Sequence, residues 1–273
     1  MKKLLSLVLA LALVLSLGTA GAEALKTITI GATPSPHQEV LELIADDLKE
    51  LGFELKVITF TEYPLPNPAL ANKELDANYF QHMPYLNAYN VTVDEKEQLF
   101  AAIPVHYEPY GIYAGKTKSL DALPDGATIT ITNDPSNETR ALFLLRDAGL
   151  ITLPEDATPE SSLIVLDIID NPKNLNIVEV EASTLPATLD DADLAVINGN
   201  FAIGAGLSPA KDALFLEPVE GESAQIYANY VVIRPEDTDA DFVAALKTVL
   251  QSDKVKEYML NNEAYAGGVI PMF

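Results

Sequence analysis

The segment that most limits the possible folds is the run "KTITIGATPSPHQEVLELIADDLKELGFELKVITF" at residues 26–60. Residues 26–30 are β-branched and alternate in polarity, residues 31–36 carry turn chemistry, and apolar residues then recur at helical spacing up to Leu51. Residues 53–60 form a second strand. When a helix joins two strands, the strands pair in parallel and the connection is a right-handed crossover. The sequence therefore predicts an α/β sheet that binds ligands beyond the carboxyl ends of its strands.

This alternation of strands and helices continues along the chain and then begins again after the polar and aromatic segment "HYEPYG". Further strands are expected at residues 77–80, 128–132, 176–180, 194–197 and 226–234, and helices at 67–73, 83–90, 133–149, 163–169 and 238–259. We expect two α/β lobes joined by more than one crossing of the chain, with a ligand cleft between them. Lobe 1 comprises residues 26–108 plus 226–273, and lobe 2 comprises residues 109–225.

The first residues resemble a secretory signal peptide, because two lysines precede an apolar run and then small residues ending near Ala22. The apolar run, residues 4–17, is shorter than the roughly 20 residues that a membrane-spanning helix needs. We therefore expect residues 1–22 to be a signal peptide and the protein to be exported. The formal net charge of −23 argues against nucleic acid as a partner, and the lack of cysteine excludes disulfides and thiol nucleophiles.

Most motifs of enzyme chemistry are missing from the sequence. There is no glycine-rich phosphate loop and no G-x-S-x-G nucleophile elbow. His37, His82 and His106 are far apart and lack the spacing of a helical zinc site. We expect no catalytic residue, metal or cofactor. A secreted hydrolase with His82 or His106 as its base is the alternative from another class, and it requires a nucleophile or metal beside that histidine.

The stretch "DANYFQHMPYL", residues 76–86, gathers four rings at what reads as a strand end. Side chains alternate faces along a strand, so Phe80 and His82 leave the sheet together, while Tyr79 and Gln81 point the other way. Pro84 stops the strand because it has no backbone N–H. A histidine beside aromatic residues is more often packing than function, and the spacing alone leaves both interpretations open.

The segment "TNDPSNETR" reads as a strand end followed by a capped helix. Asn133, Asp134 and Ser136 are all good N-cap residues, and Pro135 suits the first turn. Arg140 lies one turn into this helix, where its guanidinium can hold a carboxylate in a two-pronged geometry near the positive helix end. Arg140 is therefore a candidate anion clamp.

Two asparagines lie at or within apolar strands. Asn198 ends the strand in "LAVINGNFAIGAG", and Asn229 lies inside "IYANYVVI". An asparagine after a strand often only makes a turn, but its carbonyl can equally accept a hydrogen bond from an ammonium group. A buried amide without a partner costs about 1 to 3 kcal/mol, so we expect Asn229 to be bound to something specific.

These pieces together resemble a known family. The segments "DANYFQHMPYL", "EPYGIYAGKTKSLDALPDG", "TNDPSNETRALFLL", "NPKNLNIVEVEASTLPATLDDADLAVIN" and "GLSPAKDALFLE" are similar to the methionine-binding proteins of bacterial ABC importers, the methionine-uptake lipoproteins. The similarity runs from about Thr27 to the C-terminus. It implies a type II periplasmic-binding fold that closes on L-methionine and delivers it to a membrane permease with its ATPase.

The resemblance also implies roles for particular residues. Arg140 would hold the ligand carboxylate, and Asn198 and Asn229 would serve the amino end. The side chain would be enclosed by rings, with an amide near its polar end: Tyr63, Phe80, His82, Tyr85 and Asn137. A thioether makes favourable contacts with aromatic ring edges, which gives a physical reason for this wall.

Two departures from the family pattern bear on location and ligand choice. The signal ends in "SLGTAGAEA", where most relatives carry a lipid-modified cysteine, so we expect a periplasmic or cell-surface protein for which a lipid anchor is doubtful. The residues after Asn198 also differ from those of some relatives. Another amino acid or a short methionine-containing peptide is therefore an alternative ligand. A secreted adhesin or signalling protein that reuses the fold is a third hypothesis.

Overall fold

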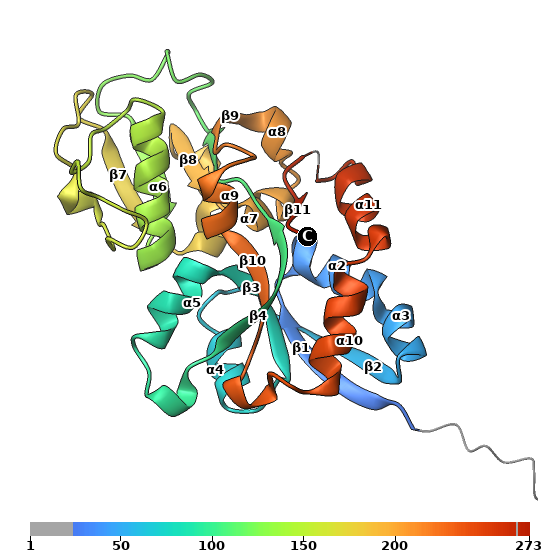
Figure 1. Cartoon of the computed structure of the whole chain (residues 1–273). Coiled ribbons are helices and arrows are strands. Elements are labelled where there is room, and N and C mark those ends of the chain that lie inside the picture. The colour runs from blue at the N-terminus through green and yellow to red at the C-terminus, as the bar shows by residue number, and fades with distance from the viewer. Residues whose placement is uncertain (1–23, 266) are drawn as a thin grey trace, which may run out of the picture.

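The computed structural model describes residues 24–265 and 267–273 (Figure 1). The expected signal peptide, residues 1–22, lies outside this range. Within the described part of the chain, no helix is both long enough and apolar enough to cross a membrane.

The first lobe is built on a six-stranded mixed sheet in the order β11-β4-β10-β3-β1-β2. Its strands are β1 (Lys26–Ala32), β2 (Phe53–Thr59), β3 (Ala77–His82), β4 (Phe100–Tyr107), β10 (Ala228–Ile233) and β11 (Ile270–Pro271). The β1 strand pairs in parallel with β2 and with β3, which confirms the crossover predicted from residues 26–60. The β10 strand runs antiparallel between β3 and β4.

The second lobe is built on a five-stranded sheet in the order β7-β6-β8-β5-β9. Its strands are β5 (Gly111–Ala114), β6 (Thr128–Thr132), β7 (Asn176–Val180), β8 (Leu194–Ile197) and β9 (Ala213–Leu216). The β6 strand is parallel to both neighbours, while β5 is antiparallel to β8 and β9. The two-lobed α/β fold expected from the sequence is thus confirmed.

The chain passes between the sheets twice (Figure 1). It leaves β4 at Tyr107 and enters β5 at Gly111, and it leaves β9 at Leu216 and returns into β10 at Ala228. The predicted lobe boundaries, after residues 108 and 225, stay predictions. The first lies in the segment between β4 and β5, and the second lies in the segment between β9 and β10.

Helices cover both faces of the first sheet and flank the second (Figure 1). They are α2 (Glu39–Leu43), α3 (Ala45–Glu50), α4 (Pro66–Ala71), α5 (Met83–Asn90), α6 (Pro135–Asp147), α7 (Gly199–Gly204), α8 (Pro209–Asp212), α9 (Glu222–Ile226), α10 (Asp241–Leu250) and α11 (Asp253–Asn261). Segments with other helical geometries occur at Pro34–Gln38, Glu95–Glu97, Val165–Asp167, Ala182–Asp190 and Pro235–Asp237. One large core lies between the first sheet and the group α2, α3, α10 and α11.

Two helix predictions need correction. Residues 163–169 do not form a helix, and only the single turn Val165–Asp167 is helical. Four of the seven residues are β-branched, which disfavours a helix, and Leu166 is 87% exposed, so the segment has no continuous buried face. The helix predicted over 238–259 is two helices, because Ser252 begins α11 as an N-cap that accepts a hydrogen bond from the Val255 backbone N–H.

Candidate functional site

A buried cavity lies where the two lobes meet. It is lined by residues of both lobes and of the segments that join them: Tyr63, Phe80, Gln81, His82, Tyr85, Glu108, Asn137, Arg140, Asn198, Gly199, Asn200 and Asn229. The space not filled by atoms, with the open solvent at its mouth included, amounts to about 330 Å³. All eight residues that the sequence analysis assigned to ligand contact border this one cavity. Their contact with a ligand stays a prediction.

One wall of the cavity is aromatic. The ring of Tyr63 lies 5.9 Å from that of Phe80 and 5.7 Å from that of Tyr85, measured between centroids, and Phe80 and Tyr85 are 5.6 Å apart. These tilted and edge-on arrangements are favourable for aromatic rings. The Tyr63 hydroxyl donates a hydrogen bond to the Asn200 side-chain carbonyl across the lobe interface. The three rings therefore form an apolar wall, and the hydrogen bond to Asn200 fixes the Tyr63 ring at the edge of that wall.

The alternation predicted along β3 explains how this wall is placed. Phe80 and His82 border the cavity, as expected. Tyr79 points to the other face and is fully buried in the core of the first lobe. Gln81 does not follow the predicted alternation, because its side chain bonds Asn67 and Asn78 and borders the cavity, and the pairing of β3 with β10 shifts register at this point.

Asn137 links the two lobes at the polar end of the cavity. Its Oδ1 accepts hydrogen bonds from His82 Nε2 at 3.0 Å and from Asn198 Nδ2 at 3.0 Å. Its Nδ2 and its backbone N–H both donate to Asp134, the N-cap of α6. Burial, and then the nearby Arg140 charge, lowers the pKa of His82 to about 3, so its imidazole is neutral at pH 7. A neutral His82 can keep the proton on Nε2 and accept the Tyr85 backbone N–H at Nδ1.

Arg140 is buried in the cavity wall, but its two-pronged geometry is made with a protein carboxylate. Its Nε donates to Glu217 Oε1 at 2.8 Å and its Nη2 donates to Glu217 Oε2 at 2.5 Å. Nη2 also donates to the main-chain oxygen of Glu108 at 2.8 Å. The Nη1 nitrogen has no hydrogen-bond partner among the described residues and is the part of the guanidinium left for a ligand.

The surroundings of Arg140 favour its charged form. Burial alone lowers the pKa of Arg140, but the attraction and hydrogen bonds of Glu217 outweigh this effect and raise it. The guanidinium carbon also lies 4.0 Å from the centroid of the Tyr227 ring, a cation–π contact. Glu217 in turn accepts the Tyr107 hydroxyl and the Tyr110 backbone N–H.

Five residues of this site were not predicted: Gln81, Glu108, Gly199, Asn200 and Glu217. Glu217 and Arg140 are more than 70 residues apart in the sequence, so no local sequence pattern indicates that they pair. Glu108 lies in the quoted segment "HYEPYG", and its place at the predicted boundary between the two lobes was the available signal.

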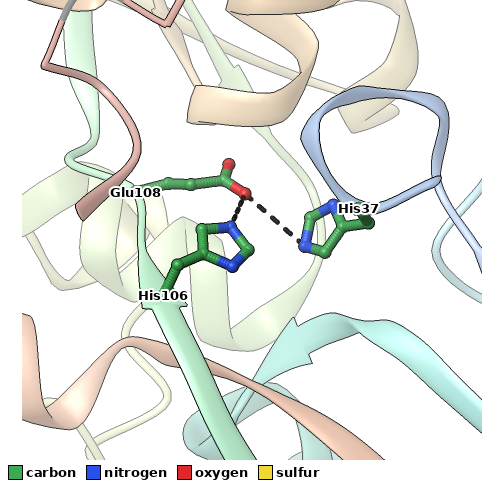
Figure 2. A group of neighbouring side chains, drawn as sticks. All are labelled: His37, His106 and Glu108. Atoms are coloured by element: carbon green, nitrogen blue, oxygen red, sulfur yellow. Dashed lines mark hydrogen bonds and ion pairs between the residues drawn. The ribbon is translucent and has the colours of Figure 1, made fainter. Parts of the chain in front are cut away.

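Glu108 also belongs to a buried group with His37 and His106 (Figure 2). His106 Nε2 lies 2.7 Å from Glu108 Oε1, and His37 Nε2 lies 3.5 Å from the same oxygen. Two donor atoms on one tetrahedral zinc ion lie about 3.3 Å apart. The shorter distance is that of a hydrogen bond, so we assign the group to a hydrogen-bonded network. The structure thus brings two of the three histidines together, and His82 lies apart from them beside Asn137.

Both histidines of this network are uncharged at neutral pH. Burial is the main cause, and it lowers the pKa of His37 to about 4 and that of His106 to about 3. His37 Nδ1 bonds the Thr33 hydroxyl at 2.8 Å, and its Nε2 lies 3.2 Å from Asn229 Oδ1. The partner expected for the buried Asn229 amide is therefore His37.

Two α/β lobes that enclose a buried cavity between them define a solute-binding protein of the two-lobed, type II periplasmic class. The chain belongs to the NlpA lipoprotein family, whose model matches residues 28–273. It is 39% identical over 249 residues to the methionine-binding lipoprotein MetQ of Bacillus subtilis, covering 90% of this chain and 88% of that protein.

Solved structures agree with this assignment. A nutrient-binding protein from Burkholderia cenocepacia bound to methionine is 40% identical, with a TM-score of 0.84 over 90% of this chain and 100% of that one. An ABC transporter periplasmic substrate-binding protein from Coxiella burnetii is 38% identical, with a TM-score of 0.80 over 89% and 99% of the two chains.

Proposed function

We propose that this protein is an exported, non-enzymatic binding protein that captures methionine and delivers it to the permease and ATPase of an ABC importer. The observation that carries the proposal is the convergence of eight residues from both lobes on one buried cavity. Its aromatic wall suits a thioether and its polar end suits an amino acid backbone. The methionine named for the relatives from Bacillus and Burkholderia supports the same ligand class.

The surroundings of the histidines favour binding over hydrolysis. In the described part of the chain, the side-chain hydrogen-bond partners of His82 and His106 are Asn137, Tyr79 and Glu108. None of these is a serine or threonine that could act as a nucleophile, and the sequence has no cysteine.

Calorimetric titration with L-methionine tests the proposal. We expect saturable binding of one ligand per protein, and the same titration with D-methionine, methionine sulfoxide, other amino acids and methionine-containing dipeptides ranks the alternatives. Mass spectrometry of ligand released from the purified protein identifies the occupant without a choice of panel. Silence toward the whole panel, with no released ligand, would rule the proposal out.

Arg140→Ala tests the role of the guanidinium in this site. Leaving a buried ligand carboxylate without its cation costs about 2 to 5 kcal/mol, so affinity for L-methionine should fall by a factor of roughly 30 or more. Arg146→Ala is the matched control, because Arg146 lies on the same helix, is more exposed and does not border the cavity. Equal affinities of the two variants would place the ligand carboxylate elsewhere.

A further inference from the structure

Two buried carboxyl groups lie at or beside the cavity, and only one of them is paired with a cation of the protein. Arg140 is matched by Glu217, with which it forms a bidentate ion pair. Glu108 is a second buried carboxylate at the cavity, and within the described residues no lysine or arginine nitrogen lies within 4.0 Å of it. The two histidines that contact it are neutral at pH 7 because burial lowers each pKa. The protein therefore supplies no matching cation for Glu108, and burial without one raises the pKa of its carboxyl group.

Glu108 is held in place from several sides. His106 Nε2 donates to its Oε1 (Figure 2). The Tyr79 hydroxyl bonds the other ring nitrogen of His106. The start of α7 at Gly199 also packs closely against the Glu108 side chain. Position 199 must be glycine for this approach, since a Cβ there would lie 2.7 Å from Glu108 Cβ and 2.8 Å from Oε2. A carboxylate offers about four acceptor sites, so these contacts leave capacity for a further donor.

A second acceptor beside Glu108 has no donor. Asn198 Oδ1 is buried and makes no hydrogen bond within the described structure. The orientation of this amide is set by its Nδ2, which donates to Asn137 Oδ1 at 3.0 Å. Asn198 directly precedes Gly199, which packs against Glu108, and both Asn198 and Glu108 border the cavity. An unpaired buried acceptor is costly, so the site calls for a ligand with donors at this end.

We propose that Glu108 is the counter-ion of the ligand's α-ammonium group and restricts the site to amino acids with a free, protonated amino group. An ammonium group has three donors and one positive charge, so it favours the ionised form of the buried Glu108 carboxyl group and donates to the orphaned Asn198 Oδ1. This inference rests on the proposed function, in which Arg140 receives the carboxylate of the same ligand. Ligands that keep the carboxylate and thioether but replace the ammonium group by a hydroxyl or an amide should bind more weakly than methionine, because they bring no positive charge to Glu108.

The test pairs a change in the protein with a change in the ligand. L-Methionine and its 2-hydroxy analogue, 2-hydroxy-4-(methylthio)butanoic acid, are titrated against the wild type and Glu108→Gln. We expect Glu108→Gln to weaken methionine by about 30-fold or more and the hydroxy analogue by no more than about threefold, since only methionine loses a charged partner. Binding of the hydroxy analogue also reports that the variant is folded.

Further variants and outcomes separate this inference from the proposed function. Glu138→Gln removes another buried carboxylate that does not border the cavity, and both ligands should bind it as they bind the wild type. Glu108→Asp keeps the charge and should still prefer methionine to the hydroxy analogue by at least about tenfold. Equal losses for both ligands in Glu108→Gln, or no preference in Glu108→Asp, would overturn the role of Glu108. A wild type that does not bind methionine would instead overturn the proposed function.

Discussion

Glu217 does not border the cavity, but its ion pair with Arg140 holds the Arg140 guanidinium in the cavity wall. Both side chains are almost completely buried, and the pair contacts both segments that join the lobes. Arginine presents its donors as a rigid planar fork, so filling the Nε and Nη2 positions fixes the direction of Nη1. The sequence analysis expected the two-pronged contact to be made with the ligand, and the structure assigns it to Glu217.

Glu217→Gln should destabilise the protein strongly. Removing one partner of a buried ion pair typically costs about 3 to 5 kcal/mol, because the remaining charge is left without compensation. Asp47→Asn is the matched control, since Asp47 pairs with Lys254 at 2.7 Å on the surface, where such pairs contribute about 1 kcal/mol or less. Urea unfolding of the two variants measures the difference, and similar losses would show that burial adds nothing to the Arg140 pair.

The residues of the candidate site could be predicted from the sequence only in part. Helix capping gave Asp134 as one of three N-cap candidates, and helix position pointed to Arg140; both are local rules. The roles of Tyr63 and Asn137 came from family resemblance. Glu108 and Glu217 were not predicted because the role of each carboxylate depends on residues that are distant in the sequence. A buried carboxylate is recognisable as functional only when its neighbours are known.

At the level of elements, the start of α6 organises the polar end of the cavity. Asp134 accepts the Asn137 backbone N–H, the Asn137 side chain and the Ser136 hydroxyl, and its other oxygen accepts from Thr132. One N-cap thus both begins the helix and orients the amide that bridges His82 and Asn198. The helix is amphipathic, and its buried face packs into the core of the second lobe.

Asp134→Ala should therefore affect both stability and binding. Loss of an N-cap costs about 1 to 2 kcal/mol, and the freed Asn137 amide should weaken methionine binding by several-fold. Ser252→Ala removes the cap of α11 and should cost a similar amount of stability without changing affinity. Thermal unfolding and calorimetry on the same samples separate the two effects. Unchanged affinity in Asp134→Ala would show that Asn137 is oriented by other contacts.

Helices and strands were predicted correctly where their apolar side chains pack against another element, and incorrectly where those side chains stay exposed. The parallel strands β1 and β6 are buried and strongly β-branched, so their identity is local. Residues 163–169 have similar apolar content, but Leu166 and Ile169 are largely exposed. Apolar composition alone does not show which side chains will be covered. The break before α11, in contrast, carried a readable signal in Ser252.

For the whole molecule, the histidines determine part of the response to acid. All three are buried, and burial lowers their pKa values to about 4 for His37 and about 3 for His82 and His106, below the ordinary 6.5. The unfolded chain therefore binds protons near pH 6.5 while the folded protein does not. Their contribution to stability is complete above pH 6.5 and is lost as the pH falls toward 4.

Two measurements check this response. The imidazole Cε1 proton resonances of the folded protein should stay unchanged from pH 8 to pH 5, whereas in urea they should titrate near 6.5. Each histidine should lower the free energy of unfolding by on the order of 1 to 2 kcal/mol between pH 6.5 and 5. A resonance that titrates near pH 6.5 in the folded protein would show that its histidine is open to solvent.

The two segments that join the lobes differ in length, and this sets the mechanics of opening. Between β4 and β5 the chain has only Glu108, Pro109 and Tyr110, a tether that spans at most roughly 11 Å. The return segment, residues 217–227, is longer and contains α9. We therefore expect any opening to turn the lobes about the short tether. Glu108 lies within that tether, so we expect its carboxylate to move little in such a turn and to be in position before a ligand arrives.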